Sequence, residues 1–384
     1  MTTPLDALPL DQLRTRTSTK WAKYPEDVLP MFVAETDFAP APAITRALRA
    51  AVDRGDTGYV PPRTPYPEAF ASFARRRFGW DVDPARVRTT CDVMMGMAEL
   101  IRAVAQPGEG VIVTPPVYPP FFDVHDESHT DAVRVPLART DGGWELDLDG
   151  IDAAFAAGAR AILLCNPHNP TGTVHSRESL AALAEIARRH GVWVISDEIH
   201  APLTMPGVVF TPFLDASPAA ADVGVVVTSA SKSFNLAGLK CAHFVTASPE
   251  TTRVVRRIPM EVEWRTGLFG IIAGIEAYER SDEWLDSLVA RLDLNRRLLV
   301  ELLEEHVPGA RYVPGDAGFL GWIDFSALGW GDDPARRILK EAKVALNPGR
   351  SFGEEGLGFA RINYGTGPEI LELAVSRIGA LVGR

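Results

Sequence analysis

Short apolar runs alternate with amphipathic segments through the middle of the chain. Beyond Arg86, four runs have the length and composition of buried strands, at 111–114, 161–165, 192–196 and 223–228. Helical periodicity lies between them, for example at 98–105 and 177–189. Apolar strands separated by helices predict a mainly parallel sheet with helices on both faces. The pattern therefore indicates an α/β fold.

The two ends of the chain follow different patterns. The first part is rich in proline and turn formers, which predicts an extended arm rather than an independent domain. Helices are predicted at 43–54 and 67–78, in a long region from Pro259 to Glu304, and at 369–381, with strands at 318–325, 344–346 and 359–363. We predict an arm over 1–45 that contributes to the small domain, a large domain over 46–275 and a small α+β domain over 276–384.

Composition narrows the classes of protein. The chain has 384 residues, 46% hydrophobic and 23% charged, which is typical of a soluble globular protein with a large core. A net charge of −11 disfavours nucleic-acid or anionic-membrane partners. The cysteines, Cys91, Cys165 and Cys241, lack CxxC spacing, so we expect reduced, mostly buried thiols. With no signal-peptide pattern and no apolar run of membrane-spanning length, we expect a cytoplasmic protein. No metal site is predicted.

Polar clusters follow the predicted strands. They read PPVYPPF, NPHNPTG, DEIH and SASK, each directly after an apolar run. In parallel sheets, ligands bind beyond the carboxyl ends of the strands. This coincidence predicts a ligand site at that edge of the sheet.

Lys232 lies in the SASK cluster, among small residues beyond the run at 223–228. Partial burial would lower its pKa and make the amine a nucleophile towards an aldehyde. The alternative is an ordinary loop lysine at the end of a core strand.

Three further charged or titratable residues have two interpretations each. Asp197 ends an apolar strand, where it is either a helix cap or ion-pair partner, or the group that keeps a heteroaromatic nitrogen protonated. His200 would lie near the same ring. Arg361, inside the apolar segment FARIN, suits bidentate binding of a carboxylate or an internal ion pair.

Three uncharged features are equally open. Asn169 belongs to a turn and could also donate a hydrogen bond to a ligand oxygen. Tyr118 could stack on a planar cofactor or pack in its loop. Residues 92–94 precede a helix, whose first N–H groups form a seat for phosphate.

Together these segments resemble the fold-type I pyridoxal-phosphate enzymes, in particular the MalY/PatB-type C–S lyases, which are cystathionine β-lyase-like. The resemblance covers almost the whole chain and is carried by TSTKWAKYPEDVLPMFVAETDF, GDTGY, PPVYPPF, NPHNPTG, SDEIHAPL, SASKSFNLAGLK, NPGRSFGEEG and FARIN. The segments SASKSFN, NPTG and DE are typical of the superfamily. The KW…DF segment with DEIH favours the lyase subgroup over ordinary aminotransferases.

The resemblance implies pyridoxal 5'-phosphate as cofactor and a role for each candidate residue. Lys232 would carry the cofactor covalently, Asp197 would pair with its pyridine nitrogen, Asn169 would donate to its phenolate oxygen and Tyr118 would stack on its ring. His200 would take the place of a tyrosine that many aminotransferases have there. Arg361 would hold the substrate carboxylate. The phosphate would be bound by Asp92, Val93 and Met94 with Ser229, Ser231 and Lys240, and by Tyr59 from the neighbouring subunit of a homodimer.

The resemblance also implies an activity. We expect a C–S β-lyase that cleaves L-cystathionine or related L-cysteine S-conjugates to a thiol, pyruvate and ammonia. Residues 34–38 read AETDF where the subgroup commonly has ADMDF, and Gly318-Phe319 replaces a hydroxyl residue and tyrosine. These departures concern the substrate side chain. The alternatives are an aminotransferase, an enzyme that tailors cysteine conjugates in secondary metabolism, and a regulatory protein on the same scaffold.

Overall fold

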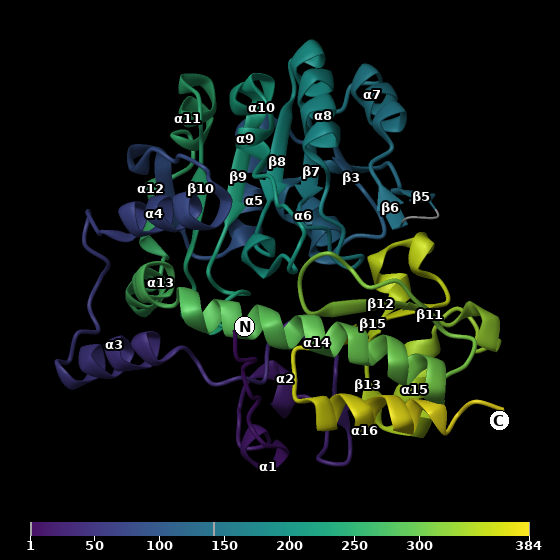
Figure 1. The fold of residues 1–384 in the computed structure, drawn as a ribbon. Helices are drawn as coiled ribbons and strands as arrows, with labels where there is room; N and C mark the ends of the chain where they lie inside the picture. Colours follow the sequence, from purple (N-terminus) through teal and green to yellow (C-terminus); the bar gives the residue numbers. More distant parts are fainter. Residues whose placement is uncertain (1, 141–142, 384) are drawn as a thin grey trace.

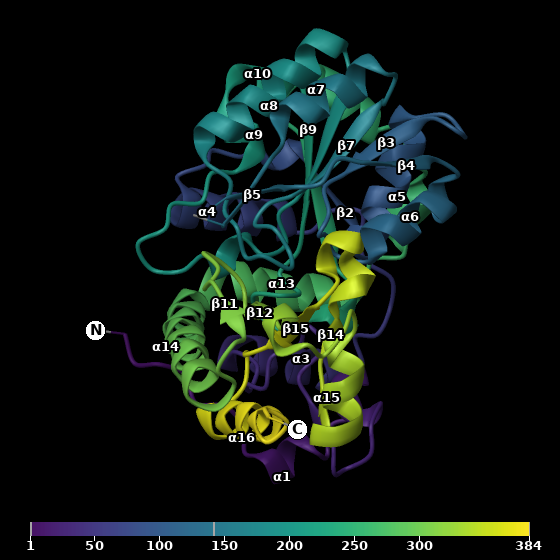
Figure 2. The ribbon, with the colours of Figure 1, turned by 90° about the vertical axis from the view of Figure 1, so that its right-hand side faces the viewer.

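A seven-stranded sheet forms the centre of the large domain. The structure is a computed structural model that describes residues 2–140 and 143–383. The strand order is β2-β10-β9-β8-β7-β3-β4, and only β10 runs antiparallel to its neighbours. The strands span β2 Val87–Thr90, β3 Gly110–Val113, β4 Asp131–Arg134, β7 Ala161–Cys165, β8 Trp193–Asp197, β9 Gly224–Thr228 and β10 Ala242–Val245. This topology confirms the predicted α/β fold (Figures 1 and 2).

Alternating side chains of the central strands pack into two separate cores. Val225 and Val227 of β9 belong to the cluster that contains Met97 of α5 (Val93–Val104). Val226 belongs to the cluster with Leu183 of α8 (Arg177–His190). Since successive side chains of a strand point to opposite faces, a strand covered on both sides must be apolar throughout. This explains the continuous apolar runs.

Helices surround the sheet on both faces. Alongside it lie α4 Tyr66–Phe78, α5, α6 Pro120–Ser128, α7 Leu148–Ala156, α8, α9 Phe213–Ala216, α10 Pro218–Val223, α11 Pro249–Val255 and α12 Met260–Trp264. Helices α3 Pro42–Asp53 and α13 Leu268–Arg280 pack against each other below the sheet in Figure 1. A small hairpin, β5 Ala138–Thr140 and β6 Gly143–Glu145, lies outside the main sheet. Within the described residues, no helix combines the length and the apolarity needed to cross a membrane.

The C-terminal part forms a second, antiparallel sheet in the order β11-β12-β15-β14. Its strands are β11 Arg311–Tyr312, β12 Leu320–Asp324, β14 Asn347–Pro348 and β15 Phe359–Asn363, and its helices are α14 Asp282–His306, α15 Pro334–Ala342 and α16 Pro368–Gly379. In Figure 1 the large sheet lies above α14, with α16 and the N-terminal arm below it. The domain limits at 45 and 275 stay a prediction.

The N-terminal arm is more structured than predicted. It contains two one-turn helices, α1 Leu10–Leu13 and α2 Thr19–Ala22, and β1 Leu29–Pro30, which pairs in parallel with β13 Val344–Ala345. The arm is therefore held against the C-terminal part through the pairing of β1 with β13.

Several sequence predictions of local structure were incomplete, and strands β2 and β4 were also not predicted. Helix α5 begins at Val93 and not at 98, because the Asp92 side chain caps it by accepting a hydrogen bond from the Met95 N–H at 2.8 Å. Strand β10, with sequence AHFV, was not predicted, because four residues that include a histidine give no clear period. The predicted region from Pro259 to Glu304 divides into three helices, α12, α13 and α14.

Candidate active site

A cavity of about 240 Å³ lies where the carboxyl ends of the parallel strands meet the N-terminal arm. It is lined by Ala34, Cys91, Asp92, Val93, Met94, Tyr118, Cys165, Asn169, Asp197, Ile199, His200, Ser229, Ser231, Lys232, Ala237, Lys240 and Cys241. Of the predicted site residues, all except Tyr59 and Arg361 line this cavity. Arg361 reaches it through a hydrogen bond to Asn169. The predicted edge of the sheet is thus the place where the candidate side chains converge.

Lys232 follows β9 and places its amine in the cavity. The residue is half-buried because part of its side chain borders the cavity. Its Nζ donates to the backbone oxygen of Ala34 at 3.2 Å. Burial, helped by the nearby Arg361 charge and opposed by Glu35 and Asp197, lowers the pKa of Lys232 to about 8. An amine with such a pKa is partly neutral near physiological pH and can act as a nucleophile.

Asp197 is the last residue of β8 and is buried. Its Oδ1 accepts a hydrogen bond from the Ile199 N–H at 3.0 Å. Burial raises the pKa of Asp197 to about 7, and the Ile199 bond and the Lys232 charge act against that rise. Among the described residues it pairs with no cation within 4.0 Å, so a cation in the cavity would find this carboxylate without a partner.

Arg361 lies on β15 and is buried. Its Nη1 donates to Asn169 Oδ1 at 2.9 Å and its Nη2 to the Phe32 backbone oxygen at 3.1 Å. The guanidinium lies 4.9 Å from the centroid of the Phe352 ring, and the buried Nε has no partner in the described part of the chain. Burial lowers the pKa of Arg361 to about 10.

The internal ion pair considered for Arg361 does not form. Within the described residues, no carboxylate lies within 4.0 Å of its guanidinium, whereas Arg296 of α14 pairs with Asp293 at 2.7 Å. A buried cation without a counter-ion is costly, so Arg361 is a ready site for a carboxylate ligand.

The contact with Arg361 also orients Asn169. A guanidinium only donates hydrogen bonds, so the atom at 2.9 Å must be the amide oxygen. The amide NH₂ is therefore left as a donor in a side chain that lines the cavity. The turn itself passes close to the C-terminal part: a Cβ on Gly172 (φ +73°) would lie 2.8 Å from the Gly315 Cα.

An anion seat is built at one end of the cavity. Helix α5 starts at Val93, so its first N–H groups lack intrahelical acceptors. Lys240 Nζ lies 3.1 Å from Asp92 Oδ2. Ser229 and Ser231 line the same cavity, and Ser229 Oγ accepts the Ser231 N–H at 3.0 Å while donating to the Cys241 oxygen at 2.6 Å. The arrangement suits a phosphate group.

Tyr118 and His200 complete the cavity as neutral groups. Burial raises the pKa of Tyr118, with Arg361 acting in the opposite direction. Burial lowers the pKa of His200 to about 3, with Lys232 and Arg361 adding to the shift. The His200 ring meets Phe319 edge-on at 6.2 Å, and its buried Nδ1 has no partner among the described residues.

Tyr59 is not brought to this cavity within one chain. Its side chain is 98% exposed, in the loop between α3 and α4. Its expected contact with the phosphate of a neighbouring subunit therefore stays a prediction.

Sequence reasoning missed some residues that line the cavity. All three cysteines border it, whereas composition indicated only buried thiols. Cys91 directly follows β2, Cys165 is the last residue of β7 and Cys241 directly precedes β10. Their positions at the ends of strands could have indicated that they border the site. Ala34 was missed because it comes from the arm, far away in sequence.

The donor set fits pyridoxal 5'-phosphate. The cavity offers an amine for its aldehyde, a carboxylate for its ring nitrogen, an amide donor for its phenolate oxygen and a helix N-terminus for its phosphate. Among the described residues, no three His, Cys, Asp or Glu side chains cluster to hold a metal ion. Fold and site together define a fold-type I pyridoxal-phosphate enzyme.

Comparison with known proteins agrees with that class. The chain belongs to the family described as "Aminotransferase class I and II", whose sequence profile matches residues 26–378. It is 35% identical to cystathionine beta-lyase PatB of Bacillus subtilis, over 94% of this chain and 96% of that protein. It is 34% identical to a cystathionine beta-lyase of Corynebacterium glutamicum, over 97% and 99% of the two chains. A PLP-bound C-S lyase from Staphylococcus hominis has a TM-score of 0.90 at 27% identity, with 96% of both chains covered. The predicted family is thereby confirmed.

Proposed function

We propose that this protein is a pyridoxal-phosphate-dependent C–S β-lyase. It would cleave L-cystathionine or related L-cysteine S-conjugates to a thiol, pyruvate and ammonia. The observation that carries the proposal is one cavity in which neither the Lys232 amine nor the Asp197 carboxylate forms an ion pair within 4.0 Å in the described chain. The names of its relatives, two of them cystathionine beta-lyases, support the choice of reaction.

The chain's residues divide the binding of the cofactor among them. Lys232 would form the covalent link, and Asp197 would hold a proton at the ring nitrogen. A cation at that nitrogen would lower the pKa of Asp197, because an opposite charge favours the ionised carboxyl. Asn169 donates to the phenolate oxygen, and Tyr118 packs on the ring. The phosphate is bound by the backbone of Asp92, Val93 and Met94, with Ser229, Ser231 and Lys240.

Arg361 orients the substrate. Its guanidinium is buried and without a counter-ion in the described structure, so the substrate's α-carboxylate supplies the missing charge. The same contact aims the Cα–H bond towards Lys232. Because Asn169 accepts from Arg361 and would donate to the phenolate oxygen, its amide would align the substrate with the ring.

Lys232 moves the proton that starts the reaction. Its neutral amine would remove the Cα proton of the bound substrate as a general base. The bound cofactor supplies an electron sink for the pair left at Cα. The bond between Cβ and sulfur then breaks, and the thiolate leaves. A lowered Lys232 pKa favours this step, because the amine must be neutral to accept the proton.

The nearest rival is an aminotransferase, which uses the same residues and shares the family. L-Cystathionine is supplied to the loaded enzyme with and without a 2-oxo acid, and thiol and pyruvate are measured. The proposal expects both products without the oxo acid. Strict dependence on the oxo acid would establish the aminotransferase. A panel of S-substituted cysteines then ranks the leaving groups by the rate of thiol release.

We also propose a cytoplasmic homodimer in which Tyr59 reaches the neighbouring subunit's phosphate. The support is the nearly complete exposure of Tyr59, which is unusual for a large aromatic side chain. Light scattering measures the assembly.

A further inference from the structure

A segment of the N-terminal arm, residues 32–37, passes between the cavity and the C-terminal part, and we name it the strap. Two of its carbonyl groups accept hydrogen bonds from Arg361 and Lys232. The Phe32 oxygen accepts from Arg361 Nη2 at 3.1 Å, and the Ala34 oxygen accepts from Lys232 Nζ at 3.2 Å. The strap therefore contacts both groups on which the proposed reaction depends.

Two asparagine side chains clamp the strap from either side. Asn235, three residues beyond Lys232, accepts from the Thr36 N–H at 3.1 Å and donates to the Thr36 oxygen at 3.0 Å. Asn363, two residues beyond Arg361, donates to the Val33 and Glu35 oxygens at 2.6 and 2.7 Å. Asn235 thus lies close in sequence to Lys232, and Asn363 lies close to Arg361. These are the two cations that the strap contacts.

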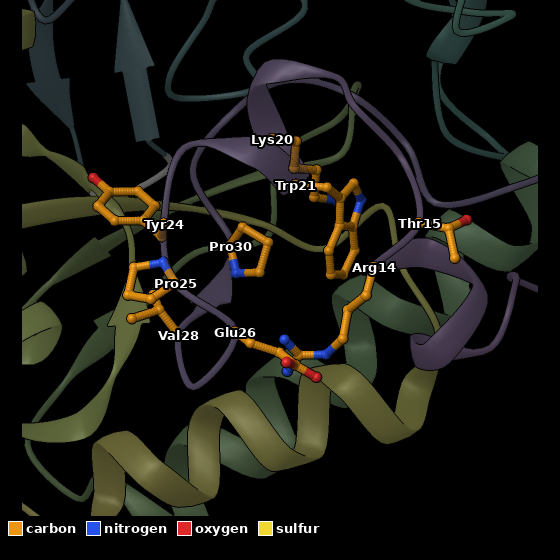
Figure 3. A pocket seen from close by; sticks show the side chains of 9 residues that line it. All are labelled: Arg14, Thr15, Lys20, Trp21, Tyr24, Pro25, Glu26, Val28 and Pro30. Carbon is orange, nitrogen blue, oxygen red and sulfur yellow. The ribbon is translucent and has the colours of Figure 1, made fainter.

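A buried ion pair anchors the end of the strap. Lys20 Nζ lies 2.7 Å from Asp37 Oδ2 and also donates to the Glu35 oxygen at 3.2 Å. Both side chains are almost completely buried, and Trp21 Nε1 donates to Asp37 Oδ1 at 3.0 Å. Lys20 and Trp21 also border a pocket formed by the arm itself, where Figure 3 shows them side by side. Neither lines the cavity that holds Lys232.

The Lys20–Asp37 ion pair is not well explained by a contribution to the stability of the folded protein alone. The desolvation of two buried charges consumes much of their attraction, so a buried pair often contributes little net stability while it fixes one geometry. Here the geometry fixed is that of the Phe32 and Ala34 carbonyls.

We propose that Lys20 is a positioning residue of the active site. Through Asp37 and the Glu35 carbonyl it holds the strap, and the strap in turn orients Arg361 and Lys232. This inference rests on the proposed function only in treating Arg361 as the site for the carboxylate of an amino acid.

The test measures amino-acid binding separately from catalysis. L-Alanine, which has no leaving group at Cβ, is titrated into the loaded enzyme, and its Kd is read from the cofactor's absorption. Because Lys20→Met would loosen the strap that orients the Arg361 guanidinium, and that guanidinium would make charged hydrogen bonds to the carboxylate of L-alanine, the Kd is expected to weaken by about 10- to 100-fold. The Kd for L-alanine can be measured whether or not the wild type proves to be a C–S lyase. A negative lyase assay can therefore be distinguished from a result that contradicts the positioning role of Lys20.

Two further variants separate positioning from stability. Lys20→Met with Asp37→Asn leaves no unpaired buried charge, so its Tm should recover most of what Lys20→Met loses, while its Kd stays weak because the Glu35 contact is still missing. Leu180→Ala removes a buried side chain of α8, outside the strap and its contacts, and should lower Tm with an unchanged Kd. A Kd that stays at the wild-type value in Lys20→Met, or that recovers together with Tm in the double variant, overturns the proposal.

Discussion

Two lysines of this chain, the buried Lys20 and the half-buried Lys232, differ in their partners. Lys20, in the arm, is paired with Asp37 at 2.7 Å. Lys232, in the cavity, donates to a backbone oxygen and, in the described part of the molecule, has no carboxylate within 4.0 Å. The burial of a lysine is therefore not by itself evidence that its amine takes part in a reaction. Lys20 is held in an ion pair, whereas the Lys232 amine has no ion pair within 4.0 Å among the described residues, as the role proposed for it requires.

The same contrast applies to the carboxylates. Asp37 is satisfied by Lys20 and Trp21, whereas Asp197 has only the Ile199 N–H. Burial without a cation raises the pKa of Asp197 to about 7. The cavity thus keeps uncompensated groups that a ligand can satisfy, at a cost to the stability of the protein without ligand.

The largest effect is expected from Lys232→Ala. Without the amine there is neither a covalent link nor a general base, so turnover should fall by about 10⁴-fold or more. The absorption band of the covalently linked cofactor should disappear. Lys20→Met is the contrasting variant and should keep that band. Retained turnover in Lys232→Ala refutes its assignment.

Asp197→Asn should follow. The amide cannot hold a proton at the ring nitrogen as a carboxylate does, so kcat/KM is expected to drop by about 10²- to 10⁴-fold. Steady-state kinetics with saturating cofactor measures it. A loss below tenfold would show that the carboxylate does not serve the ring.

Arg361→Gln is expected to raise KM for the amino-acid substrate by about 10- to 100-fold, because it removes a charged hydrogen-bond donor for the carboxylate. Arg361→Lys keeps the charge but loses the fork, so its KM should lie in between. An unchanged KM in both variants would remove Arg361 from the binding of substrate.

The paired and unpaired carboxylates should also differ in the protein without cofactor. The pKa of Asp197 is raised from 3.8 to about 7, so at pH 8 the folded state carries a costly buried charge that fades as pH falls through 7. The Tm of Asp197→Asn should therefore exceed that of the wild type at pH 8, by a margin that shrinks towards pH 5. Asp37→Asn should lower Tm at pH 8, because it breaks a pair. A change in Tm of the same sign for both variants at pH 8 would contradict the predicted difference between the paired and the unpaired carboxylate.

The smallest effect is expected from Tyr59→Phe. Loss of one hydrogen bond to phosphate should weaken cofactor binding by about tenfold or less. Equilibrium dialysis of the cofactor measures it, with Tyr24→Phe in the arm as control. A Kd equal to that of the control would exclude the contact across the dimer.

Much of the fold could be read from the sequence. The strands β7 and β15 begin and end where they were predicted. In β7 burial on both faces requires an apolar residue at every position, whereas β15 keeps its buried Arg361 and Asn363 between apolar neighbours. Helix α8 lies within one residue of its prediction at 177–189. The start of α5 was missed because only the cap at Asp92 marks it. The methionines that follow Asp92 do not themselves indicate where a helix begins.

The sequence by itself determined the alternation of strands and helices, the edge of the sheet where polar clusters meet and the residue types available for the chemistry there. These follow from local periodicity and from the position of polar residues at strand ends. Only the tertiary structure decided which charges are compensated. It paired Lys20 with Asp37, left Lys232, Asp197 and Arg361 without an ion pair within 4.0 Å in the described chain, and brought Ala34 and Phe32 to the site. The reason is physical: the energy of a buried charge depends on neighbours that lie far away in sequence, and no local pattern records them.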